Sequence, residues 1–126
     1  MSEEAGRHFA LMARARMALH ANRRKRAAFS DCPVDMGDPA WDILLALFSH
    51  ATVCRPIPMT TVIAETGLPE IATRRYAAQL CEAGLALHKL EQAGSDSPRL
   101  GLTRKGIKRI RAVLAEDVTM SAHLAA

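Results

Sequence analysis

The sequence has few cysteines and few aromatic residues, and it has no long apolar run. Its three cysteines, Cys32, Cys54 and Cys81, lie far apart, form no CxxC pair and do not group with the five histidines. This spacing argues against a structural zinc site, and we expect neither a metal nor a cofactor. An aromatic content of 4% argues against binding of single strands by base stacking. No apolar run approaches the length of a membrane span, so no membrane partner is expected.

The motifs that usually mark enzymes are also missing. The sequence contains no phosphate-binding P-loop, no GxGxxG, no HExxH and no GxSxG pattern. Asp35, Asp38 and Asp42 lie close together, but they surround an expected helix start, where capping explains them. We therefore expect a protein that is not an enzyme.

The cysteines leave two interpretations of Cys81 open. It lies among the apolar positions of an expected helix, which favours a small core residue, and a redox-sensing thiol is the alternative. An odd cysteine count without a signal peptide indicates reduced thiols in the cytoplasm. The Arg- and Ala-rich start imitates a transit peptide, but Glu3 and Glu4 argue against that interpretation.

Charge is distributed unevenly along the 126 residues, which are enough for one domain with a modest core. Residues 1–30 hold seven Lys/Arg and two acids, residues 31–72 hold one Arg and six acids, and residues 74–111 hold nine Lys/Arg and three acids. Two basic blocks around an acidic middle fit a nucleic-acid surface, and solvated helix faces are the alternative.

Residues 3–28 are expected to form a long helix that needs a partner. An apolar stripe at helical spacing comprises Phe9, Met12, Ala13, Met17 and His20. A body this small cannot cover such a helix, so a second subunit is the natural cover. The run of residues 23–26, Arg-Arg-Lys-Arg, either stabilises the helix C-terminus or contacts phosphates.

Residues 30–38 are expected to form a loop, after which Asp38 caps a helix whose first turn begins with Pro39. The core stripe expected for that helix comprises Trp41, Leu44, Leu45 and Phe48. Trp41 is interpreted as a core anchor, with a ligand platform as the alternative. Residues 55–58 end the helix and leave room for one short strand.

Residues 60–103 predict a helix-turn-helix followed by a hairpin. Thr60 is the expected N-cap of the first helix, Gly67 supplies the turn, and Pro69 fits the first position of the second helix. That second helix has a buried face of Thr73, Ala77, Leu80 and Gly84 and an exposed face of Glu70, Ile71, Arg74, Arg75 and Ala78. Strands are expected at 85–90 and 100–102 around a turn at 94–98. A final helix begins near Thr103, and residues 118–126 are expected to fray.

This order predicts a mainly α protein with a small β-hairpin (α+β), a winged helix-turn-helix with long terminal helices. The expected parts are a basic N-terminal dimerisation helix at 1–29, a DNA-binding domain at 30–112, and a C-terminal helix end and tail at 113–126.

Two stretches resemble the MarR-type winged-helix transcriptional regulators. They are Ile63-Ala-Glu-Thr-Gly-Leu-Pro-Glu-Ile-Ala-Thr-Arg-Arg75 through Leu80-Cys-Glu-Ala-Gly-Leu85, and Leu102-Thr-Arg-Lys-Gly106. The resemblance covers about residues 38–112. It implies a homodimer held by the terminal helices, with the helix at 69–83 in a major groove and Arg75 at the position of the family's usual DNA-reading arginine. The family commonly has Asp-x-Arg in the wing, at positions that hold Gly94 and Asp96 here.

We therefore expect a sequence-specific duplex-DNA binder that regulates transcription as a homodimer. The alternative is a winged helix that contacts proteins, which Glu70 and Ile71 favour. No roomy apolar pocket is evident in the sequence, so a small-molecule effector is not supported. The candidate DNA-binding residues are Thr60, Thr61, Glu70, Ile71, Arg74, Arg75, Lys89 and Arg99.

Overall fold

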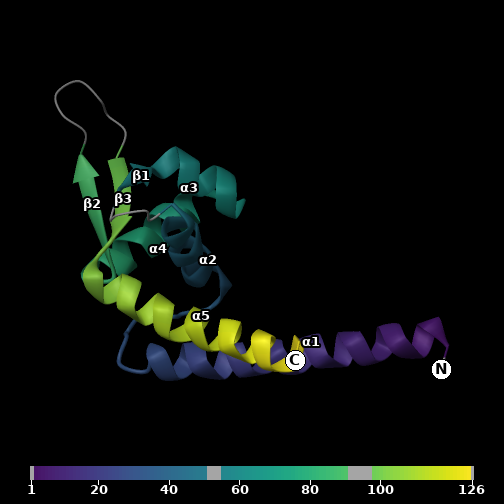
Figure 1. Ribbon diagram of the computed structural model, residues 1–126. Helices are drawn as coiled ribbons and strands as arrows, with labels where there is room; N and C mark the ends of the chain where they lie inside the picture. Colours follow the sequence, from purple (N-terminus) through teal and green to yellow (C-terminus); the bar gives the residue numbers. More distant parts are fainter. Residues whose placement is uncertain (1, 51–54, 91–97, 126) are drawn as a thin grey trace. The chain divides into compact units, whose positions relative to one another are not determined.

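Five helices and a three-stranded sheet make up the part of the chain that the structure describes, residues 2–50, 55–90 and 98–125. The structure is a computed structural model, drawn as a ribbon in Figure 1. Its contacts divide the chain into two units, one formed by residues 1–30 and 112–126 and the other by residues 31–111. The predicted class, mainly α with a small sheet, is confirmed.

The first unit contains α1 (Glu3–Ala28), whose bounds agree with the sequence prediction. The Ser2 side chain accepts a hydrogen bond from the Ala5 N–H at 3.2 Å and so caps the helix start. Glu3 and Glu4 lie in the first turn, and Lys25 and Arg26 lie in the last. This charge order complements the helix dipole, and it stabilises a helix that is otherwise largely solvated.

No residue of α1 is buried within the chain. The expected stripe is therefore open to solvent at Phe9 (58% exposed) and Met12 (43%), and Leu11 and Leu19 are also exposed. Within the same unit, Arg24 Nε donates to the backbone carbonyl of Val113 on α5 at 3.4 Å.

The second unit begins with α2 (Asp38–Ser49), for which two details of the prediction are wrong. Gly37 is the N-cap, so Asp38 and Pro39 are the first two helical residues. The buried face comprises Ala40, Ile43, Leu44, Ala46 and Leu47, whereas Trp41, Leu45 and Phe48 are half-buried. Apolar side chains surround much of this helix, so spacing alone did not identify the inner face.

The helix-turn-helix consists of α3 (Met59–Thr66) and α4 (Glu70–Glu82), joined at Gly67 with φ +70°. Here the predicted caps are off by one or two residues. Pro58 and Pro69 are the N-caps, with ψ 143° and 144°, and Thr60 lies inside the first turn of α3. An extended ψ is typical of an N-cap, so each proline lies one residue outside its helix. Thr73, Ala77 and Leu80 are buried as predicted.

The sheet has the order β1–β3–β2, and both pairings are antiparallel. The strands are β1 (Ile57–Pro58), β2 (Ala86–Leu90) and β3 (Pro98–Leu102). The short strand expected near residues 55–58 is therefore present, while most of the predicted turn at 94–98 lies outside the described residues. Fully buried core side chains of this unit include Ile43, Leu44, Met59, Val62, Leu80, Leu85 and Leu100.

The last helix, α5, runs from Arg104 to Ala125. It continues past residue 118, where the sequence prediction placed a frayed end. The segment after Gly106 contains neither glycine nor proline and is rich in good helix formers, which accounts for the difference. Among the described residues, no helix combines the length and the apolar character that crossing a lipid bilayer requires.

Candidate nucleic-acid interface

Helix α4 presents an exposed face, with two arginines, opposite its buried one. Thr73, Ala77 and Leu80 face the core, and the Thr73 hydroxyl donates to the Pro69 carbonyl at 3.0 Å. The other side carries exposed Ile71, Arg74, Arg75 and Ala78, spaced i, i+3, i+4 and i+7. All residues predicted to be exposed on this helix are therefore at the surface, namely Glu70, Ile71, Arg74, Arg75 and Ala78.

Arg74 is held by its own helix. Its Nε lies 3.1 Å and its Nη2 lies 3.0 Å from Glu70 Oε1, one turn earlier. Both side chains are about half exposed or more, so the pair contributes little to stability. Its effect is on position, because it keeps the Arg74 guanidinium close to the first turn of α4.

Arg75 has a different environment. Its guanidinium carbon lies 5.2 Å from the centroid of the Tyr76 ring, a cation–π distance. No hydrogen bond links its guanidinium to another described residue, so its fork of donors remains available to a ligand. Among the described residues, Arg74 thus uses part of its guanidinium within α4, whereas the guanidinium of Arg75 makes only the contact with the Tyr76 ring.

The first helix of the motif offers two hydroxyl groups. Thr60 is exposed and Thr61 is half-buried, both in the first turn of α3. Neither caps the helix, since Pro58 occupies that position. The Thr60 hydroxyl is therefore accessible beside backbone N–H groups that have no partner within the helix.

The hairpin strands carry the two remaining candidates. Lys89 on β2 and Arg99 on β3 are register partners. Lys89 is exposed, whereas Arg99 is half-buried and donates through Nη1 to the Pro56 carbonyl at 3.4 Å. The positions at which the resembled family has Asp-x-Arg, Gly94 and Asp96, lie outside the described residues.

Hydrogen bonds of Thr103 connect the end of α4 to the start of α5, and we call this set of contacts the α4–α5 joint. The Thr103 hydroxyl donates to the Gly84 carbonyl at 2.6 Å and accepts from the Gly106 N–H at 3.0 Å. The Thr103 N–H donates to the Leu85 carbonyl at 3.1 Å. Gly84, just after α4, has φ +76°, which suits glycine. The Gly-Leu and Leu-Thr-x-x-Gly segments are therefore two halves of one joint, which fixes the end of α4.

A second link joins α5 to the segment before α2. Arg109 binds the Asp31 carboxylate through two hydrogen bonds, of 2.6 and 2.8 Å. These bonds lower the pKa of Asp31 from 3.8 to about 2. Sequence reasoning missed this pair, because 78 positions separate its members and no local signal connects them. By contrast, the i, i+4 spacing of Glu70 and Arg74 was visible in the sequence.

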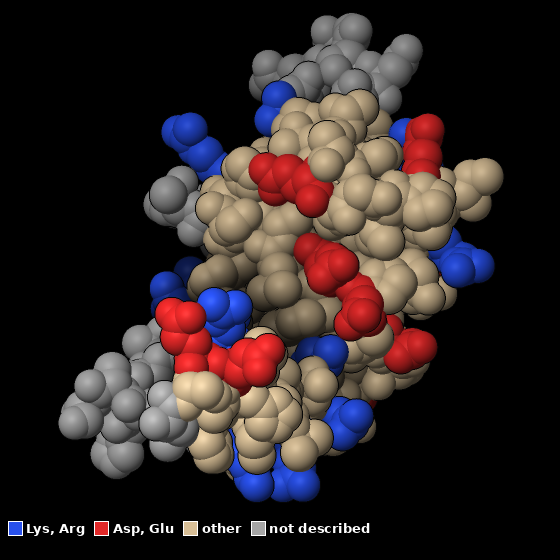
Figure 2. All heavy atoms as spheres, turned by 90° about the vertical axis from the view of Figure 1, so that its right-hand side faces the viewer, with Lys and Arg blue, Asp and Glu red and all other residues tan. Residues whose placement is uncertain are grey.

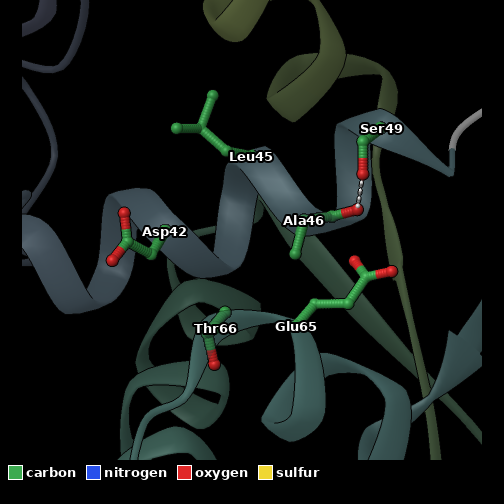
Figure 3. A pocket seen from close by; sticks show the side chains of 6 residues that line it. All are labelled: Asp42, Leu45, Ala46, Ser49, Glu65 and Thr66. Atoms are coloured by element: carbon green, nitrogen blue, oxygen red, sulfur yellow. Dashed lines mark hydrogen bonds between the residues drawn. The ribbon is translucent and has the colours of Figure 1, made fainter.

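A hollow of about 360 Å³ lies between α2 and α3. Figure 2 shows Asp and Glu side chains on one face of the chain, among residues without charge. Figure 3 shows the lining side chains of the hollow, which come from Asp42, Leu45, Ala46, Ser49, Glu65 and Thr66. Ser49 and Thr66 donate to the carbonyls of Ala46 and Val62, both at 2.8 Å, and Glu65 pairs with His50 at 2.5 Å. Most polar groups of the hollow are therefore engaged within the protein.

The described residues show no further site for metal binding or thiol chemistry. Within residues 2–50, 55–90 and 98–125, no cluster of three His, Cys, Asp or Glu side chains is arranged to hold a metal ion. Burial raises the pKa of the half-buried Cys81 thiol, which lowers its thiolate fraction and its reactivity. This environment favours the packing interpretation of Cys81 over redox sensing.

Comparison of the sequence with protein-family models gives no match, and comparison with curated proteins gives none. Solved structures do match. RV1404 from Mycobacterium tuberculosis superposes with a TM-score of 0.78 at 19% identity, over 99% of this chain and 80% of that one. A MarR family protein from Bacillus stearothermophilus gives 0.63 at 17% identity, over 98% and 81%. The chain has a MarR-type winged-helix fold.

A third structure with this fold was solved with nucleic acid. It is a variant of S. aureus MepR bound to an oligodeoxyribonucleotide, with a TM-score of 0.68 at 13% identity, over 93% of this chain and 81% of that one. At such identities the likeness establishes the fold. The MarR-type resemblance found in residues 63–85 and 102–106 is thus confirmed at the level of architecture.

Proposed function

We propose that this protein is a sequence-specific duplex-DNA-binding transcriptional regulator that acts as a homodimer, with α4 in the major groove. The observation that carries the proposal is the exposed face of α4, where Arg74 and Arg75 stand opposite a fully buried face. A helix fixed on one side and cationic on the other fits the width of the major groove. The fold of the DNA-bound MepR variant adds support.

Each candidate residue has a role in this proposal. Arg75, whose guanidinium is available, forms two hydrogen bonds to a guanine edge. Arg74, held by Glu70 near the start of α4, contacts a phosphate, as do Thr60 and Thr61 at the start of α3. Lys89 and Arg99 add phosphate contacts from the hairpin.

The dimer is proposed from α1. A 26-residue helix with no buried residue and with exposed Phe9, Leu11, Met12 and Leu19 needs an apolar cover. A second copy supplies that cover and gives two reading helices related by a two-fold axis. Light scattering should then show a dimer at tens of micromolar, roughly the range in which a stable dimer persists. A monomer at that concentration would refute the proposed homodimer.

A winged helix that contacts only proteins is the second candidate, favoured by the acidic Glu70 and the apolar Ile71 on the same face. Selection from random duplexes, followed by fluorescence anisotropy at several salt concentrations, separates the two. A DNA regulator should enrich a pseudo-palindrome with half-sites about 10–10.5 bp apart. Its affinity should fall with a log–log salt slope of about −0.9 per phosphate contacted. Failure to enrich or bind any duplex would favour the protein-contact function.

A further inference from the structure

An isoleucine lies near the centre line of the exposed face of α4. At about 100° per residue, Arg75 lies about 40° to one side of Ile71 and Arg74 about 60° to the other. Ile71 is 83% exposed, more than any other large apolar side chain that the structure describes as exposed. Among the described residues of the unit 31–111, it is the only exposed large apolar side chain.

The isolation of Ile71 from other exposed apolar side chains indicates which class of partner it can contact. A protein-docking surface needs several neighbouring apolar side chains, whereas Ile71 is flanked by two arginines and by Ala78 on the next turns. A single aliphatic group between guanidinium groups matches the floor of the major groove. There the C5-methyl of thymine is the apolar group that base edges present.

We propose that Ile71 is a specificity-determining residue that contacts the C5-methyl group of a thymine, a role that rests on the proposed function above. Ile71 and Arg75 are four residues apart, which is about 6 Å along the helix axis. Successive bases are stacked about 3.4 Å apart along a strand. The thymine therefore lies one or two base pairs from the guanine that Arg75 reads.

The experiment uses a duplex selected from a random pool by the full-length protein. Each thymine of one half-site is replaced in turn by uracil, which removes only the methyl group, and anisotropy measures binding at one salt concentration. At one position near the guanine, the wild-type protein should lose about four-fold in affinity, the equivalent of ~0.8 kcal/mol for one buried methylene-sized group. Ile71→Ala should bind the thymine duplex more weakly and should lose nothing further when uracil replaces that thymine.

Arg74→Ala is the matched control, because it alters the same face and should keep the full response to uracil. Circular dichroism checks that each variant is folded. We expect both variants to fold, because the Ile71 and Arg74 side chains are exposed. A wild-type protein that ignores uracil at every position would overturn the role of Ile71 while leaving DNA binding intact. A full uracil response in Ile71→Ala, or unchanged affinity of that variant, would also overturn it. If no duplex is bound at all, the proposed function itself fails, and the role of Ile71 fails with it.

Discussion

Gly106 faces the backbone carbonyl of Leu85 so closely that a Cβ atom at position 106 would overlap the carbonyl oxygen. The obstacle is main chain, which cannot rotate away as a flexible side chain can. The contact seats the first turn of α5 against the end of α4, beside the hydrogen bonds of Thr103. It explains physically why glycine occupies the last position of the Leu-Thr-x-x-Gly segment.

Gly106→Ala should therefore destabilise the fold by about 1–3 kcal/mol, the usual range for overpacking a tight contact. The measurement is denaturant unfolding followed by circular dichroism. Gly6→Ala in α1 is the matched control, because a Cβ there meets no atom within 4 Å. That control should be neutral or stabilising by up to about 1 kcal/mol, since alanine is the better helix former. Equal free energies of unfolding for the two variants would contradict the claim that the tight contact between Gly106 and Leu85 requires glycine.

The sequence prediction succeeded where a local pattern determines the structure, at the glycine turns and along α4. Gly67 and Gly84 have positive φ and mark the turn and the end of α4, because few other residues adopt that backbone. The buried positions of α4 follow a clean helical period, so its exposed arginines were identified correctly. Periodicity failed in α2, where large apolar side chains such as Trp41 and Phe48 lie beside the inner face and leave no single stripe.

What the sequence could not supply was long-range pairing. The Asp31–Arg109 bond depends on the path of the chain between two distant segments, which no local pattern records. The hydrogen bond from Arg99 to Pro56 also depends on the position of β1 beside β3. The exposure of Ile71 was expected, but only the structure shows how isolated this side chain is within its unit.

The Glu70–Arg74 pair predicts that Glu70 restrains DNA binding. Glu70→Gln removes a negative charge from the face of α4 and frees the Arg74 guanidinium. Affinity for scrambled duplexes should rise, because Arg74 then pairs with its phosphate without competition from Glu70, and the salt slope should keep its value, because the number of phosphate contacts is unchanged. Salt-dependent anisotropy measures both. The control is Glu82→Gln at the other end of α4, and an equal rise in that variant would assign the effect to net charge alone.

The Asp31–Arg109 pair predicts that the stability of the fold depends on pH in the acidic range. Because the folded-state pKa of about 2 lies below the ordinary value of 3.8, ionised Asp31 stabilises the fold above about pH 3.8. That contribution is lost as the pH falls through 3.8 toward 2. NMR titration of the Asp31 carboxyl in the wild-type protein should give the low value, and Arg109→Gln should return it toward 3.8. A wild-type midpoint near 3.8 would show that the pair does not persist in solution.

The basic run at residues 23–26 has two interpretations that salt can separate. Arg24 already bonds to the Val113 carbonyl, so the test uses the exposed Arg23 and Arg26. If both contact phosphates, replacing them with Gln should reduce the magnitude of the log–log salt slope by about 1.8. The control replaces Arg14 and Arg16, also exposed on α1, with the same change in net charge. A slope reduced equally in both variants, or in neither, would assign the run to solvation of the helix end.

The central claim is that Arg75 reads a base, and substitution of this residue tests it most directly. Arg75→Ala is compared with the wild-type protein on the selected duplex and on a scrambled duplex at one salt concentration. The account predicts a loss of about 1–3 kcal/mol on the selected duplex and little loss on the scrambled one. Arg75→Lys should restore only part of the loss, because an ammonium group lacks the planar fork. Equal losses on the two duplexes would contradict the assignment of Arg75, and no loss on either would contradict major-groove binding by α4.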